Sequence, residues 1–191
     1  RWFNAAPGLS LASLQGRPVF LHAFQMLCPG CVQQAVPQSL KVAAAFADTD
    51  LAVIGLHTVF EHHAVMGPDA LQVFLHENRI GYPVGVDAYR DDDPSGHPLP
   101  LTMQAYAMQG TPTLCLIDRQ GRLRARHFGL LDDLALGAQI GAKAETERNR
   151  PGWRRARVSA PWPPMEWPRM PMRRPSIGSI ASTSGSSSLS R

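Results

Sequence analysis

The chain has 191 residues, 44% of them hydrophobic, and a formal net charge of +4. This length and composition allow one globular domain with a sizeable core and an additional segment. No run of about 18 apolar residues is present, which excludes a membrane-spanning helix. Because the first residue is Arg1 rather than Met, we expect the sequence to be a fragment whose N-terminal residues, including any export signal, are missing.

The positive charge is confined to the C-terminal end of the chain. Residues 1–147 hold 10 Lys and Arg against 14 Asp and Glu, a net charge of −4, whereas residues 148–191 hold 9 Arg against a single Glu, a net charge of +8. The second segment is rich in Pro, Arg and Ser and has no helical or strand periodicity, which predicts a disordered tail. Arginines interleaved with tryptophans could attract nucleic acid or an acidic surface, but the composition favours a solvated extension without such a partner.

Strands and helices alternate along residues 1–147, which we assign to one folded domain. Nearly continuous apolar runs predict strands buried on both faces, and apolar positions at 3.6-residue spacing predict helices. Strands that alternate with helices and end in a hairpin predict an α/β sandwich with a mixed sheet. In chain order we expect a lead-in at 9–14, a strand at 17–24, a helix at 32–47 kinked by Pro37, a strand at 51–57, a helix at 68–80, a strand at 82–86, a loop at 88–99, a short helix at 102–108, strands at 113–118 and 123–128, and a helix at 131–144.

Two of the three cysteines, Cys28 and Cys31, stand where the first strand gives way to a helix. Positions three apart lie on one face of a helix, so these two side chains can form a disulfide. Pro29 suits the first helical position, which makes Cys28 the N-cap residue. The free N–H groups and the dipole of the helix then favour the thiolate of Cys28, while Cys31 is placed to resolve a mixed disulfide.

Other interpretations of the cysteine pair have less support. A zinc site needs four ligands, and no second pair of ligands follows at suitable spacing, because His62 and His63 are adjacent. The sequence therefore predicts no metal site. A purely structural role does not explain a proline at the start of the helix. The third cysteine, Cys115, lies in an apolar run and is expected to be a core residue.

Residues 9–143 resemble the thioredoxin-like superfamily, specifically its TlpA-like and redoxin branch. The resemblance rests on the order strand, Cys28-Pro29-Gly30-Cys31, helix, strand, inserted helix and strand, followed by Gly110-Thr111-Pro112-Thr113, a further strand and Asp118-Arg119-Gln120-Gly121. It implies a three-layer α/β/α sandwich with a mixed central sheet and an inserted helix–strand unit.

The resemblance also implies a substrate-binding surface beside the cysteines. In this family the Thr-Pro before the late strand has a cis peptide bond that faces the disulfide. Pro112 is then expected to be cis, and the Thr111 backbone is expected to pair with an extended substrate segment beside Cys28. Thr-Pro is also a bond for which the cis form costs only about 1 kcal/mol. Pro29 is assigned to the same surface.

The chain departs from thioredoxins proper at several positions. Pro29-Gly30 replaces Gly-Pro between the cysteines, Leu27 replaces a Trp, and Pro37 falls one residue later after the second cysteine. His22 replaces a buried Asp six residues before the first cysteine. A histidine on a buried strand can be a core residue, or, because its reference pKa is near neutrality, it can exchange a proton with Cys31.

Glu61 is the other candidate near the cysteines. It follows the second predicted strand, and ligand sites of open α/β sheets lie at the carboxyl ends of the parallel strands. It could contact substrate or tune the thiolate, although a solvated loop is the alternative.

These features predict a thiol–disulfide oxidoreductase in which Cys28 and Cys31 exchange disulfides with substrate. The Cys28–Cys31 couple carries the electrons, so no cofactor is expected. The expected partners are a protein dithiol or disulfide and an upstream reductant or oxidant, and the protein is expected to be a monomer. The direction of electron flow is left open. The cytoplasm is slightly favoured over the periplasm, because there is no obvious structural disulfide.

Two other functions remain as alternatives. Cys28 could be the peroxidatic cysteine of a peroxiredoxin-like antioxidant peroxidase, but Gln25 stands where those enzymes usually place Thr or Ser. A non-catalytic thioredoxin-like binding module is the third possibility. Both cysteines and Pro112 are present, which disfavours that reading.

Overall fold

The computed structural model describes residues 1–90, 96 and 98–148. All of them belong to one compact unit. The tail expected to be disordered lies outside the described residues from position 149 onward, as do residues 91–95 and 97 of the loop expected at 88–99. The elements are β1 (Trp2–Phe3), η1 (Ala12–Leu14), β2 (Val19–Phe24), η2 (Cys31–Ala35), α1 (Val36–Ala45), β3 (Ala52–His57), η3 (His63–Val65), α2 (Pro68–Glu77), β4 (Val84–Val86), α3 (Leu101–Ala105), β5 (Thr113–Ile117), β6 (Leu123–Phe128) and α4 (Asp133–Arg148).

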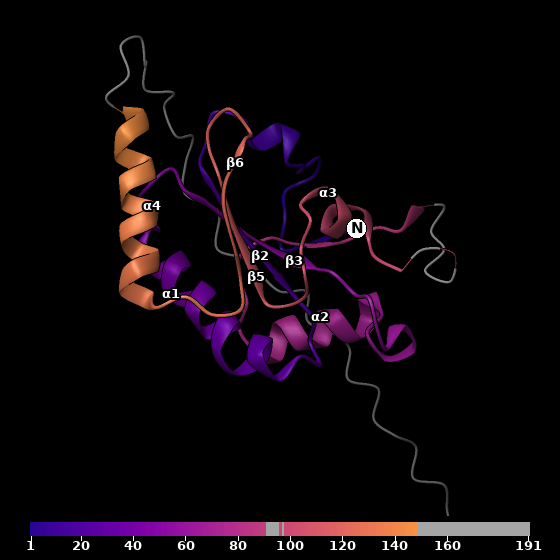
Figure 1. Cartoon of the computed structure of the whole chain (residues 1–191). Coiled ribbons are helices and arrows are strands. Elements are labelled where there is room, and N and C mark those ends of the chain that lie inside the picture. Colours follow the sequence, from indigo (N-terminus) through magenta and orange to yellow (C-terminus); the bar gives the residue numbers. More distant parts are fainter. Residues whose placement is uncertain (91–95, 97, 149–191) are drawn as a thin grey trace, which may run out of the picture. The chain divides into compact units, whose positions relative to one another are not determined.

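Six strands form one mixed sheet in the order β1-β4-β3-β2-β5-β6. Strands β2, β3 and β4 are parallel, whereas β5 is antiparallel to both β2 and β6, and β1 is antiparallel to β4. Helices α1, α2 and α4 cover one face of the sheet, and α3 lies with η1 on the other (Figure 1). The structure therefore confirms the three-layer α/β/α sandwich with a mixed sheet.

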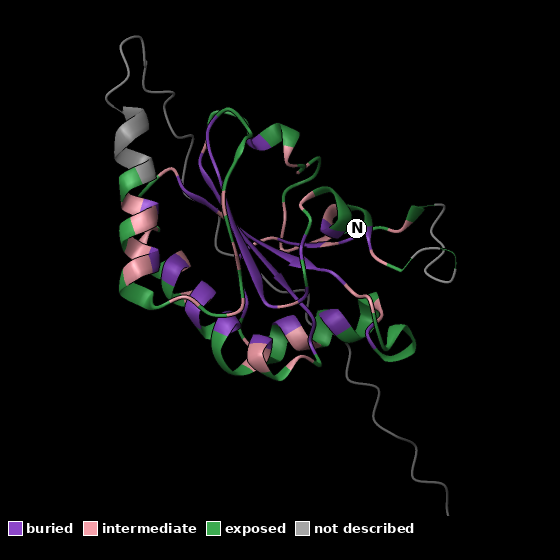
Figure 2. Cartoon of the chain, in the orientation of Figure 1, coloured by how far each residue is buried: buried purple, intermediate pink, exposed green. Residues whose placement is uncertain are grey.

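The central strands are buried on both faces, as their apolar runs predict. Every residue of β2 and of β5 is buried, whereas β6 is mostly exposed (Figure 2). Alternate residues of β2 face opposite layers: Leu21 packs in the cluster that contains Met103 of α3, and Phe24 packs against Leu71 and Leu75 of α2. Burial on both sides fixes β2 rigidly, and the cysteine segment follows it directly.

The helix after the cysteines differs from a simple α-helix. Cys28 accepts the first helical hydrogen bond on its carbonyl oxygen from the Val32 N–H at 3.1 Å, so Cys28 occupies the N-cap position. Residues Cys31–Ala35 then form a π-helical turn before α1 continues. A π turn contains one residue more than an α turn, so it accommodates Pro37 one position later than is usual. Pro37 has no N–H for an interior helical bond, and it directly follows the π turn as the second residue of α1.

The short first strand was not predicted. Strand β1 has two residues and pairs with β4 across a separation of about 80 positions, with Trp2 opposite Gly85. A side chain at Gly85 would meet the Trp2 ring at 3.2 Å, so this glycine makes room for the indole. Such a short strand has no periodicity of its own, and the sequence signal for it is absent.

Candidate active site

The sheet topology brings three separate segments to one edge. Strand β2 pairs in parallel with β3, with Phe24 opposite His57, and pairs antiparallel with β5, with Ala23 opposite Thr113. The residues after β2, the residues after β3 and the residues before β5 therefore meet at the same end of the sheet. These segments contain the cysteine pair, Glu61, and Thr111 with Pro112.

The two cysteines are close together but differ in exposure. Cys28 is half-buried and Cys31 is fully buried, and both are free thiols in this structure. The distance between Cys28 and Cys31 is 2.8 Å at their closest approach. The backbone N–H of Cys31 donates to the Cys28 sulfur at 3.4 Å, and the Cys28 thiol donates to the Thr111 carbonyl oxygen at 3.5 Å. The outer sulfur can meet a substrate, and the inner sulfur can reach only its partner.

Burial makes Cys31 a weak acid. Its pKa is raised to about 12, mainly because burial penalises the charged thiolate and also because of its hydrogen bond with Cys28. Hydrogen bonds from the Thr111 side chain and the Gln25 backbone lower the pKa, but they do not offset the burial. Cys31 therefore reacts only when a proton has left a buried sulfur.

Pro112 and Thr111 lie directly beside the cysteine segment. The Thr111–Pro112 peptide bond is cis. Pro112 is buried, and a side chain at Gly30 would lie 3.6 Å from the proline ring. The proline therefore packs against the first turn of the helix, and Thr111 places a carbonyl oxygen next to the Cys28 sulfur.

Glu61 reaches the same place through a buried glutamine. The Glu61 side chain is exposed, and its Oε1 accepts a hydrogen bond from Gln25 Nε2 at 3.3 Å. Gln25 Nε2 also donates to Thr111 Oγ1 at 3.5 Å, and Gln25 Oε1 accepts the Phe60 N–H at 3.2 Å. The structure thus brings Glu61 and Thr111 together with the cysteines.

His22 lies in the core and has no hydrogen bond to either cysteine. It is 2% exposed, and in the described part of the chain neither ring nitrogen has a hydrogen-bond partner. Its ring stacks on Phe24 at 5.3 Å between centroids. Burial lowers the pKa of His22 to about 3, and burial likewise lowers the pKa of His57 to about 4. Both imidazoles are therefore neutral near pH 7, and His22 is a weak base there.

The remaining candidates lie apart from this cluster or at its surface. Pro29 is exposed next to Cys28, and Leu27 is 56% exposed. Cys115 is buried in the cluster on the opposite face of the sheet from Cys31, and burial raises its pKa to about 12. Among the described residues no group of three or more His, Cys, Asp and Glu could hold a metal ion. No helix in the described ranges is long and apolar enough to cross a membrane.

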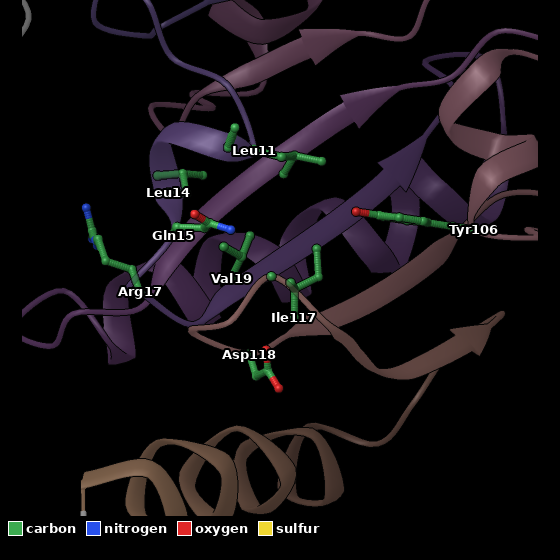
Figure 3. A pocket seen from close by; sticks show the side chains of 10 residues that line it. Leu11, Leu14, Gln15, Arg17, Val19, Tyr106, Ile117 and Asp118 are labelled. Atoms are coloured by element: carbon green, nitrogen blue, oxygen red, sulfur yellow. The ribbon is translucent and has the colours of Figure 1, made fainter. Parts of the chain in front are cut away.

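A small cavity opens at the other end of the sheet. Its volume is about 160 Å³, and its lining includes Val19 at the start of β2 and Ile117 at the end of β5 (Figure 3). The cysteines follow the opposite end of β2, so the cavity is remote from them. It is also smaller than the roughly 300 Å³ at which small-molecule sites begin.

The part played by Gln25 has only a weak signal in the sequence. From the sequence alone, Gln25 is informative only because it replaces the hydroxyl residue usual in peroxidases. The available signal is a polar residue that directly extends a nearly continuous apolar strand. A buried amide must find partners, and these partners come from segments 36 and 86 positions away.

Comparison with known proteins gives relatives among solved structures. No protein-family model matches the chain, and no curated protein matches it. The crystal structure of the thioredoxin-like superfamily protein SPOA0173 has 53% sequence identity and a TM-score of 0.70, and the match covers 75% of this chain and 90% of that one. A thiol-disulfide isomerase from Corynebacterium glutamicum has 46% identity and a TM-score of 0.69, with the same coverage of 75% and 90%.

A more distant match agrees in fold alone. The solution structure of a thioredoxin-like protein in its oxidised form has 21% identity and a TM-score of 0.60, over 76% of this chain and 88% of that one. The mixed sheet, the helix that starts at Cys28 and these matches lead to one assignment. The chain belongs to the thioredoxin-like superfamily.

Proposed function

We propose that the protein is a thiol–disulfide oxidoreductase in which Cys28 and Cys31 form the redox couple. The observation that carries this proposal is the unequal burial of two sulfurs in contact range. One is half-buried beside the Thr111 carbonyl, and the other is fully buried behind it. The relative from Corynebacterium glutamicum, described as a thiol-disulfide isomerase, supports the same class of reaction.

The reaction needs two exchanges. The Cys28 thiolate attacks one sulfur of a substrate disulfide, forms a mixed disulfide and releases the other substrate sulfur as a thiolate. Cys31 then loses its proton and attacks the Cys28 sulfur. The Cys28–Cys31 disulfide forms, and the second substrate thiolate leaves. Two electrons pass from the protein to the substrate, and the reverse sequence oxidises a dithiol. The couple acts without a metal or organic cofactor in this proposal.

In this proposal several groups form the substrate-binding surface. In the proposed complex an extended peptide pairs with the Thr111 backbone, as the family resemblance implies, and Pro112 and Pro29 flank it. The exposed side chain of Leu27 adds apolar surface next to Cys28. We assign Glu61 to the rim of this surface, because its exposed carboxylate bonds Gln25 beside Thr111 and can contact the substrate. The proposed substrate is a protein disulfide or dithiol.

Trapping with Cys31→Ser tests the proposal. This variant cannot resolve the mixed disulfide, so covalent adducts should accumulate on Cys28, and mass spectrometry of the partners then reports substrate and compartment. Insulin reduction should be active in the wild type and in Cys115→Ser, and it should be lost in Cys28→Ser. A Cys28→Ser protein with full activity would contradict the proposal and favour a non-catalytic binding module.

A peroxide assay separates the second enzyme class. In the structure the Gln25 amide is already bonded to Glu61, Thr111 and the Phe60 N–H, so it is not free to orient a peroxide. We therefore expect slow formation of sulfenic acid on Cys28. Rapid sulfenic acid formation with micromolar peroxide would instead assign the peroxidase function.

A further inference from the structure

The backbone that leads from β3 to Glu61 is held in place by the neighbouring strand segment. The hydroxyl of Thr58 donates to the buried carboxylate of Asp87 at 3.0 Å. The carbonyl oxygen of Val59 accepts the Tyr89 hydroxyl at 2.7 Å. Both partners follow β4, which pairs with β3. Glu61 therefore extends from a backbone that is already positioned.

The Glu61 side chain is held as well, although it is exposed. Gln25 is 1% exposed, and its amide oxygen accepts the Phe60 N–H at 3.2 Å, so its NH₂ group must point the other way. This NH₂ group donates to Glu61 Oε1 at 3.3 Å. One amide thus fixes both the backbone before Glu61 and the carboxylate itself. A carboxylate that is held in advance loses less rotamer freedom when it binds a partner.

The same amide places the carboxylate beside the segment that faces the cysteines. Gln25 Nε2 lies 3.3 Å from Glu61 Oε1 and 3.5 Å from Thr111 Oγ1, so both oxygens contact one nitrogen atom. The Thr111 carbonyl oxygen lies 3.5 Å from the Cys28 sulfur. These contacts form a continuous path from the outer sulfur to the carboxylate. A substrate segment that reaches Cys28 along Thr111 therefore comes close to a fixed anion.

The charge of Glu61 has no opposite charge beside it. None of the ion pairs among the described residues includes Glu61, and the amide that bonds it is uncharged. A cationic side chain of a substrate would supply the opposite charge, and an anionic one would be repelled at the same place. Both effects contribute to specificity, because specificity is a difference between the affinities for two partners.

We propose that Glu61 is a specificity-determining residue that selects substrate segments with Arg or Lys near the reacting cysteine and discriminates against segments with Asp or Glu there. Gln25 is the positioning residue that holds its carboxylate. The inference rests on the proposed function, because it names the class of protein disulfide that the Cys28 site accepts. It concerns the first exchange, in which the substrate meets Cys28.

Three peptide disulfides that differ only in charge test the inference. Each is the symmetric disulfide of a blocked peptide X-Ala-Cys-Ala-X, in which X is Arg, Gln or Glu and lies on the same side of an extended chain as the cysteine. Chromatography of the released peptide thiol gives the rate with the reduced protein, which is divided by the rate with dithiothreitol to correct for the reactivity of the peptide itself. We expect wild type to prefer the Arg peptide over the Glu peptide about fivefold, the size expected for one exposed charge pair. The preference should disappear in about 0.5 M NaCl, which screens exposed charges.

Two variants that each remove one negative charge separate a local effect from the overall charge. In Glu61→Gln the side chain keeps nearly the same shape without the charge, so the preference should be lost. Asp48→Asn is the matched control, because Asp48 is exposed and precedes β3, at the opposite end of that strand from Glu61. It should keep the wild-type preference. Gln25→Leu should weaken the preference on its own and have no further effect in the Glu61→Gln background.

The outcomes distinguish the inference from the proposed function. Equal normalised rates of wild type with all three peptides would overturn the inference and still support the proposed function. A Glu61→Gln protein that keeps the preference, or an Asp48→Asn protein that loses it, would do the same. If Glu61→Gln changed all three rates by one common factor, the carboxylate would act on the Cys28 thiolate instead of the substrate, which also overturns the inference. A wild type that releases no peptide thiol would remove the proposed function and the inference together.

Discussion

At the scale of single residues, the difference between the two sulfurs is a difference in solvation. Cys28 meets solvent and a backbone N–H, whereas Cys31 is enclosed by apolar side chains of α1, α2 and β2. The same functional group, a thiol, therefore occurs in two environments. In one of them the thiolate is accessible to solvent, and in the other burial makes the thiolate costly to form. In the proposed reaction this cost appears when Cys31 resolves the mixed disulfide.

The pH dependence of the second exchange follows from this burial. Because the pKa of Cys31 is raised to about 12, the thiolate fraction rises about tenfold for each pH unit throughout the range below that value. We expect the rate of the second thiolate release to rise with pH between 7 and 9 without a plateau, as measured by stopped flow. A plateau near neutral pH would show that Cys31 ionises far more readily than its surroundings indicate.

At the scale of elements, close packing leaves little room for a side chain at Gly55 in β3. An added side-chain carbon would lie 3.0 Å from Val84, 3.3 Å from Phe24 and 3.3 Å from Tyr82. We expect Gly55→Ala to lower the free energy of unfolding by about 1–3 kcal/mol, because three buried groups would have to move. Urea denaturation measures this change.

Gly137 in α4 provides the control for that substitution. An added carbon there meets nothing within 4 Å, and alanine is the better helix former by about 1 kcal/mol. Gly137→Ala should therefore stabilise the protein. If both substitutions had the same effect, packing around β3 would not be the cause.

The elements also show what the sequence could and could not predict. The long strands and helices were found in their correct order, because each has an apolar pattern within its own residues. Strand β1 and the π turn were missed, since the first depends on a partner strand far along the chain and the second on how the helix accommodates Pro37. At the site, the cysteines were recognised from their spacing. The role of Gln25 could not be, because it exists only when three distant segments meet.

At the scale of the whole molecule, the buried histidines make stability depend on pH. In the folded protein the pKa of His22 is lowered to about 3 and that of His57 to about 4, while an exposed histidine in the unfolded chain titrates near 6.5. Below pH 6.5 the unfolded chain therefore binds protons that the folded protein does not. Stability should fall as pH decreases from 6.5 toward 4.

His22→Leu tests this dependence. The variant removes two buried nitrogen atoms without partners in the described structure, and it removes the proton uptake of one unfolded histidine. At pH 5, which is about 1.5 units below the pKa of an unfolded histidine, protonation stabilises the unfolded chain by about 2 kcal/mol per buried histidine. His22→Leu removes this contribution for one histidine. We expect the gain over wild type to be larger at pH 5 than at pH 7 in urea denaturation. An equal gain at both pH values would contradict the explanation.

The two edge strands of the described sheet, β1 and β6, oppose pairing with a further strand in different ways. The two residues of β1 cover β4 and offer almost no backbone for another chain to extend, while β6 carries Arg124 and Arg126 along its outer run. A second molecule that approached β6 in register would set its own guanidinium groups against these. Short or charged border strands of this kind oppose edge-to-edge aggregation. The cysteine pair therefore sits on a scaffold that resists sheet extension between copies.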